Sequence, residues 1–140
     1  MIVVDVNVIA YLLIAGDKTS IAQQAWQRDP VWIVPPLWRH EMLNVLVSYV
    51  RSGGVSPDKA LATFQQATAR FGAQEQSPKM EQVLLLAAEH QISAYDAQYV
   101  ELALARNLPL ISEDRALQCK FPDTVRSLQD FCAPVDDSEL

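Results

Sequence analysis

Residues 93–103 read SAYDAQYVELA, a segment typical of the start of a helix. Ser93 can cap this helix, and Asp96 then falls at its third position, which is the spacing of a capping box. The simplest interpretation of Asp96 is therefore an acid that stabilises a helix start. Three further acids, Asp5, Glu41 and Asp114, also lie at the ends of apolar runs or near helix starts. Because four acids occupy such similar positions, a shared site is favoured over four unrelated caps.

Short apolar runs that predict buried strands alternate with helical segments along the chain. The runs are Met1–Val4, Val31–Val34 and Leu110–Ile111, and a candidate edge strand is Val125–Leu128. This alternation is typical of a parallel sheet with right-handed crossovers, so we expect an α/β fold with four or five strands. Because the carboxyl ends of parallel strands meet at one edge of the sheet, the four acids are expected to lie there together.

Two longer helices, Pro36–Arg51 and residues 56–71, are expected to form a hairpin around the turn Ser52-Gly53-Gly54. The hairpin carries little charge and many apolar residues. A partner or a second copy of the chain could cover it, or it could simply pack on the sheet. In the next predicted helix, Lys79–His90, the residues expected to face inward are Met80, Val83, Leu84 and Ala87.

Two of the acids allow more than one interpretation. Asp5 directly follows an apolar run, where a lone carboxylate is costly to bury, and either Asp5 or Asn7 could merely cap the next helix. Alternatively, Asp5 is a metal ligand and Asn7 orients that ligand or its water. Glu41 stands out on a mostly apolar helix face. It could pair with Arg39 or His40, reach solvent, or join the other acids.

Asp114 repeats the arrangement of Asp5, because an apolar run again ends in an acid. Ser112 can hydrogen-bond Asp114 or a metal-bound water. Four carboxylates that point into one crevice repel one another unless a cation joins them. Oxygen ligands without His or Cys favour Mg²⁺ or Mn²⁺ over zinc.

The composition indicates a single globular domain. The chain has 140 residues, half of them hydrophobic, which is enough for a substantial core. We expect residues 1–133 to form the domain and the acidic tail 134–140 to be disordered. The formal charge is −6, but without the four candidate site acids and the three tail acids, 10 acids stand against 11 bases. The low pI therefore does not exclude an anionic partner.

Neither a membrane segment nor a secretion signal is expected. The first apolar stretch is interrupted by Asp5 and Asn7 and follows no Lys or Arg, and no run is long enough to span a bilayer. Cys119 and Cys132 have no metal-ligand spacing and indicate ordinary buried thiols in a reducing cytosol, although the sequence leaves a disulfide open. We expect a cytoplasmic protein.

Taken together, the motifs carry a resemblance. They are Asp5-x-Asn7, Glu41 early in a helix, Ser93-Ala94-Tyr95-Asp96-Ala97, and Leu110-Ile111-Ser112-Glu113-Asp114. In this order they resemble the PIN-domain nucleases, and more narrowly the small VapC-type toxins of toxin–antitoxin pairs, over the chain to about Leu128. Two departures are mild: Val6 stands where a small or hydroxyl residue is common, and Ser112 where Thr is usual.

This resemblance implies a three-layer sandwich in which helices flank the central parallel sheet. It also implies ribonuclease activity, a homodimer and a cognate antitoxin that blocks the site. The metal-binding acids it implies are Asp5, Glu41, Asp96 and Asp114, holding Mg²⁺ or Mn²⁺, with Asn7 and Ser112 in support.

The chain offers no obvious separate general base, so we expect the metal to activate the water. Arg39, His40 and Arg115 are the bases nearest in sequence to the acids, and they could hold the phosphate backbone.

Three alternatives belong to other classes. A degenerate PIN module would bind RNA or protein without catalysis, but the intact acids argue against it. A haloacid-dehalogenase-like phosphatase would need a second Asp where Asn7 stands. A receiver domain would need paired acids after the first strand and a Lys after a late one, and the sequence has neither.

Overall fold

The computed structural model describes residues 1–134, so the expected acidic tail lies outside the described residues from position 135 on. A four-stranded parallel sheet forms the centre, in the order β2-β1-β3-β4. The strands are β1 (Ile2–Val4), β2 (Trp32–Ile33), β3 (Leu110–Ile111) and β4 (Val125–Arg126). The helices are α1 (Val6–Leu13), α2 (Thr19–Arg28), α3 (Trp38–Arg51), α4 (Pro57–Phe71), α5 (Met80–His90), α6 (Ala94–Arg106), α7 (Arg115–Lys120) and α8 (Leu128–Cys132), with a 3-10 turn η1 (Gly72–Gln74).

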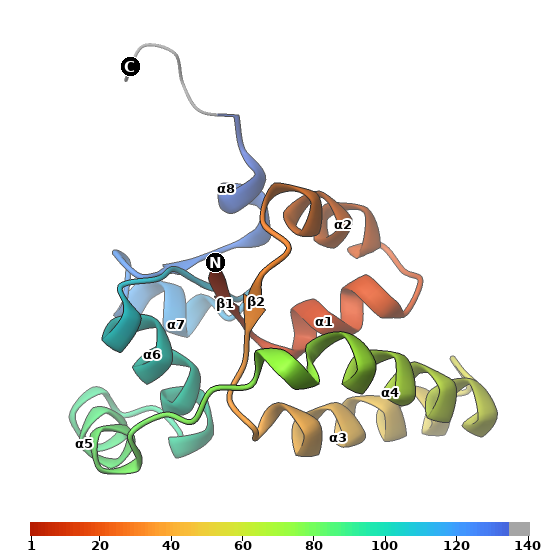
Figure 1. Ribbon diagram of the computed structural model, residues 1–140, viewed down its shortest axis with the longest axis horizontal. Helices are drawn as coiled ribbons and strands as arrows, with labels where there is room; N and C mark the ends of the chain where they lie inside the picture. The colour runs from red at the N-terminus through yellow and green to blue at the C-terminus, as the bar shows by residue number, and fades with distance from the viewer. Residues whose placement is uncertain (135–140) are drawn as a thin grey trace.

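Helices cover both faces of the sheet, which confirms the predicted three-layer α/β fold (Figure 1). Along β1, side chains alternate between two apolar clusters, because successive strand residues point to opposite faces. Ile2 and Val4 belong to a cluster with residues of α1, α3, α4 and α8. Val3 belongs to a second cluster with residues of α6 and α7. The short strands are therefore buried on both sides, as their unbroken apolar runs predict.

Helix α6 is the element that carries the SAYDAQYVELA segment, and its start has the predicted cap. The Ser93 side chain accepts a hydrogen bond from the backbone N–H of Asp96, 3.0 Å away. The helix ends at Asn107, whose φ of 54° is in the left-handed region that stops helices. Its inner face packs against the sheet, and the charge of Asp5, which follows β1, acts on Asp96 in the first turn of the helix.

Several predicted boundaries are wrong in detail. The candidate edge strand ends at Arg126, and Ser127 instead caps the short helix α8 by accepting from the N–H of Asp130. Helix α3 begins at Trp38, so Glu41 lies in its first turn. Helix α1 begins at Val6, which places Asn7 inside the helix and makes Asp5, not Asn7, its capping residue.

The predicted inner face of α5 is right for Val83 and wrong for Met80 and Leu84. Met80 and Leu84 are 62% and 67% exposed, and Val83 is the buried residue of this helix. The physical reason is that α5 packs on α6 and not on the sheet, so only a narrow stripe of the helix is covered.

The two thiols are free, and Cys119 is exposed, contrary to the expectation of two buried cysteines. Within the described part of the chain, no helix combines the length and the apolar character needed to cross a membrane.

The packing of α6 predicts a contrast between two leucines of this helix. Leu102 is 1% exposed and Leu104 is 45% exposed. Leu102→Ala should lower the free energy of unfolding by about 2–5 kcal/mol, because it removes buried methyl groups and leaves a cavity. Leu104→Ala should change it by less than about 0.5 kcal/mol. Urea unfolding of both variants measures the difference, and equal losses would contradict the burial of this face.

Candidate functional site

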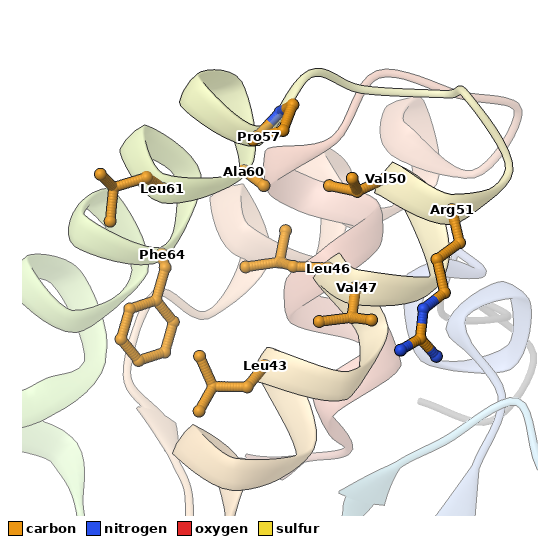
Figure 2. A pocket seen from close by; sticks show the side chains of 9 residues that line it. All are labelled: Leu43, Leu46, Val47, Val50, Arg51, Pro57, Ala60, Leu61 and Phe64. Atoms are coloured by element: carbon orange, nitrogen blue, oxygen red, sulfur yellow. The ribbon is translucent and has the colours of Figure 1, made fainter.

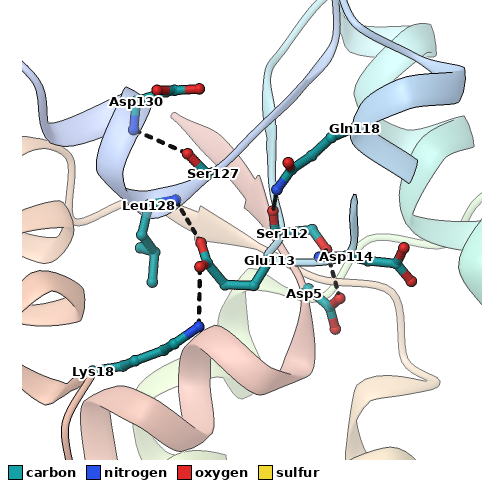
Figure 3. A network of polar contacts seen from close by, with 9 residues as sticks. All are labelled: Asp5, Lys18, Ser112, Glu113, Asp114, Gln118, Ser127, Leu128 and Asp130. Atoms are coloured by element: carbon teal, nitrogen blue, oxygen red, sulfur yellow. Dashed lines mark hydrogen bonds and ion pairs between the residues drawn. The ribbon is translucent and has the colours of Figure 1, made fainter. Parts of the chain in front are cut away.

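Asp5 and Asp114 are joined through one buried hydroxyl at the carboxyl ends of β1 and β3. The Ser112 hydroxyl donates to Asp5 Oδ2 at 2.9 Å, and Ser112 Oγ accepts from the backbone N–H of Asp114 at 3.1 Å (Figure 3). Ser112 is fully buried. The backbone fixes this arrangement, because the N–H of Asp5 donates to the carbonyl oxygen of Ile111, 3.0 Å away.

Both aspartates also cap helices, which for Asp5 is the simpler of the two interpretations of the sequence. Asp5 Oδ1 accepts from the backbone N–H of Asn7 at 3.4 Å, at the start of α1. Asp114 Oδ1 accepts from the backbone N–H of Leu117 at 3.1 Å, at the start of α7. Capping holds each carboxylate at a helix N-terminus, where the helix dipole stabilises its negative charge. The capping role and the site role are therefore compatible.

Glu41 reaches the site from α3, and its partner is a residue that sequence analysis missed. The buried hydroxyl of Tyr99 donates to Glu41 Oε1 at 2.6 Å. Tyr99 follows Asp96 by three residues on α6, and this one-turn spacing was the signal that could have revealed it. The alternative in which Glu41 pairs with Arg39 or His40 is not the one observed. Arg39 contacts Glu75 instead.

The acids act on one another electrostatically. Burial raises the pKa of Asp5, and the charge of Asp114 raises it further, against hydrogen bonds that lower it. Burial also raises the pKa of Glu41, with added repulsion from Asp5 and Asp96. The pKa of Asp96 is raised by burial first, and then by Asp5 and Asp114. Each of these shifts reflects the cost of holding like charges in a partly desolvated place.

The pKa of the Tyr99 hydroxyl is raised as well, by burial and by the neighbouring charge of Glu41. The phenol therefore stays protonated and acts as a hydrogen-bond donor to the Glu41 carboxylate.

The four carboxylates are close enough for their charges to act on one another, but they are not arranged around one point. Within residues 1–134, no group of three or more His, Cys, Asp or Glu side chains could hold a metal ion in the arrangement seen. The expected crevice with four inward-pointing acids is therefore only partly realised. Hydrogen bonds from Ser112 and Tyr99 fix two of the acids, Asp5 and Glu41, in the orientations seen.

The remaining predicted residues lie around the acids with different roles. Asn7 is exposed in the first turn of α1, and Arg115 is exposed as the first residue of α7. His40 borders a cavity of about 450 Å³ whose lining residues are Leu37, His40, Glu41, Asn44 and Tyr95. Arg39 is engaged elsewhere, because Trp38 Nε1 and Arg39 Nε both contact Glu75, which follows η1.

Glu113, between the two site residues Ser112 and Asp114, has a structural role that sequence analysis also missed. Its carboxylate accepts from the backbone N–H of Leu128 at 2.7 Å and from Lys18 Nζ at 3.1 Å (Figure 3). These two contacts tie the segment after β3 to the start of α8 and to the loop between α1 and α2. The segment that carries Ser112 and Asp114 is thereby held from both sides.

Comparison with known proteins agrees with this architecture. The chain is 28% identical over 127 residues to Ribonuclease VapC3 of Pyrobaculum aerophilum, which covers 89% of this chain and 97% of that protein. A crystal structure of PAE2754 from Pyrobaculum aerophilum has the same fold, with a TM-score of 0.74 at 21% identity over 93% of this chain and 92% of the other. The family model of the PIN domain matches residues 2–121. The chain therefore belongs to the PIN-domain family.

Proposed function

We propose that this protein is a metal-dependent endoribonuclease that hydrolyses phosphodiester bonds in RNA. The observation that carries the proposal is the Ser112 hydroxyl between Asp5 and Asp114, within the field of two further acids, Glu41 and Asp96. Membership of the PIN-domain family and similarity to a protein named Ribonuclease VapC3 support this chemistry and favour RNA as the substrate.

The donor set suits Mg²⁺ or Mn²⁺. All four side chains offer carboxylate oxygens, which these hard cations prefer, and the raised pKa values of three of them mark a place that favours a counter-charge. Asp5, Glu41, Asp96 and Asp114 are the residues that would hold the cation. When bound, the cation supplies an activated water near neutral pH and stabilises the leaving oxygen.

The chain's own residues orient these groups. Ser112 fixes Asp5 through one hydrogen bond and the loop of Asp114 through another, so both aspartates keep their positions at the sheet edge. Asn7 and Ser112 support the acids. Two basic residues are proposed to contact the RNA phosphates. They are His40, which lines the same cavity as Glu41, and Arg115, at the start of α7.

The proposed site can be tested by its effect on catalysis. Asp5→Asn, Glu41→Gln, Asp96→Asn and Asp114→Asn should each reduce cleavage of single-stranded RNA by at least a hundredfold, because each removes one proposed metal-ligand charge. A fluorescent oligonucleotide assay in Mg²⁺ or Mn²⁺ measures the rates. Asp123→Asn changes an exposed acid in the turn before β4 and should leave the rate unchanged. Near wild-type cleavage by any of the four variants would remove that residue from the proposed site.

The proposed site also makes a prediction about stability without metal. The raised pKa of Asp5 means that its carboxylate destabilises the fold once ionised. The favourable contribution of the Asp5 carboxyl to the free energy of unfolding is fully present below its ordinary pKa of 3.8. This contribution is lost as the pH rises through the higher pKa of the folded state. In EDTA, Asp5→Asn should therefore melt at a higher temperature than wild type at pH 7, and the difference should shrink toward pH 4. Differential scanning calorimetry measures both.

Adding metal should reverse this order. A cation that binds only the folded state stabilises it by roughly 2.7 kcal/mol at a hundredfold excess over Kd, or about 5–10 °C in melting temperature for a domain of this size. Wild type should show this gain in Mn²⁺, and Asp5→Asn should lose most of it. A wild-type melting temperature indifferent to both cations would contradict a shared metal site.

We further propose that the protein is the toxin of a toxin–antitoxin pair. A groove of about 360 Å³ lies between α3 and α4 and is almost wholly apolar in its lining (Figure 2). Leu43 on α3 and Leu61 on α4 are 47% and 58% exposed there. This surface suits an apolar segment of the antitoxin. The homodimer implied by the resemblance and the cytoplasmic location expected from the sequence remain predictions.

The groove gives a direct test of the partner. Co-expression with the protein encoded by the neighbouring gene should yield a stable complex with reduced nuclease activity. Leu61→Lys should weaken that complex at least tenfold while cleavage by the free protein persists, because the charge enters the apolar groove. Leu85→Lys, at a similarly exposed leucine on α5, is the matched control. A neighbour that neither binds nor relieves toxicity would refute the toxin assignment and leave the nuclease proposal standing.

A second candidate function has one observation in its favour. The acids do not form a ready metal-binding group within residues 1–134, as expected of a PIN module that binds RNA or protein without cleaving it. The cleavage assay separates the two functions, because such a module would bind RNA and release no product in either metal.

A further inference from the structure

Glu41 is the one glutamate among the four candidate acids and therefore has the longest side chain of the set. It projects from the first turn of α3, while Asp5 and Asp114 are short and each is held by a backbone N–H at a helix start. A glutamate side chain has several rotatable bonds, so its carboxylate needs an anchor to stay in one place. Repulsion from Asp5 and Asp96 adds to this need, because it favours rotation away from the other acids.

The Tyr99 hydroxyl provides an anchor of suitable geometry. It lies 2.6 Å from Glu41 Oε1, within the range of short hydrogen bonds to a charged oxygen. The tyrosine is 3% exposed, and its ring belongs to the apolar cluster that contains Val3, Ile33 and Leu102. Since the core fixes the ring, the position of the hydroxyl is fixed too. The bond engages only Oε1, and Glu41 Oε2 accepts no hydrogen bond from the described residues.

The position of Tyr99 on α6 gives the bond a further consequence. Asp96 and Tyr99 are one turn apart on the same helix, so α6 carries one acid of the site and the anchor for another. The bond spans 58 positions in the sequence and joins α3 to α6 across the site.

We infer that Tyr99 is a positioning residue, which holds Glu41 in the orientation in which the site binds its divalent cation. The inference rests on the proposed metal-dependent nuclease function. The competing view is that Tyr99 only fills the core, in which case its ring matters and its hydroxyl does not.

Tyr99→Phe separates these views because it removes the hydroxyl and keeps the ring. The variant should fold as wild type does, judged by circular dichroism. Loss of a group that orients a ligand typically weakens metal affinity or activity by 10–100-fold. The Mn²⁺ concentration that gives half of the melting-temperature gain should therefore rise about tenfold or more. In the RNA assay, kcat should fall by a similar factor with little change in KM.

Two controls make the result specific. Tyr11→Phe removes a phenol hydroxyl from the half-buried Tyr11 on α1 and should match wild type in both readouts. In a double-mutant cycle, Tyr99→Phe should have little further effect in a Glu41→Gln background, because the hydroxyl acts through that carboxylate.

The outcomes distinguish failure of this inference from failure of the function. If Asp5→Asn loses the Mn²⁺ response and cleavage while Tyr99→Phe behaves as wild type in both, the positioning role is refuted and the nuclease proposal stands. Full additivity with Glu41→Gln would refute it too, because Tyr99 would then act by another route. If Asp5→Asn and wild type respond alike, the proposed function itself fails.

Discussion

The parallel pairing of β1 with β3 is the constraint on which the candidate site depends. Its register sets Val4 opposite Ile111, so the next residues on the two strands, Asp5 and Ser112, emerge side by side at the sheet edge. A shift of one residue would exchange the two faces of the strand and separate the hydroxyl from the carboxylate. Strands of two or three residues hold this register because both faces are buried under helices. Core packing therefore sets the geometry of the polar edge.

The site concentrates negative charge in a partly buried place, and the fold tolerates it by supplying donors to the acids. Asp5 and Asp114 accept backbone N–H groups at helix starts, and Glu41 accepts a tyrosine hydroxyl. These bonds only partly offset burial and repulsion, because the pKa values of Asp5 and Glu41 remain raised. A bound cation would offset the same cost of burial and repulsion. The raised pKa values of Asp5 and Glu41 therefore support the proposed metal chemistry.

Several features were out of reach of the sequence for physical reasons. Helix α8 has five residues, too few for a helical period to appear. Met80 and Leu84 look like core residues because periodicity reports that a helix has an apolar face and not what covers it. Arg39 contacts Glu75, 36 positions away, and Glu41 contacts Tyr99, 58 positions away. The nearest opposite charge in the sequence did not predict either partner.

The sequence by itself determined the alternation of strands and helices, the parallel α/β class and the four acids at strand ends and helix starts. These features follow from local pattern: apolar runs, caps and turn residues have meaning within a few positions. Only the tertiary structure decided which side chains meet. The Ser112 bridge between Asp5 and Asp114, and the contact of Tyr99 with Glu41, require segments more than 50 residues apart to be brought together by the packed sheet and helices. Hydrogen bonds act over about 3 Å, so their partners exist only once the core has set the distances.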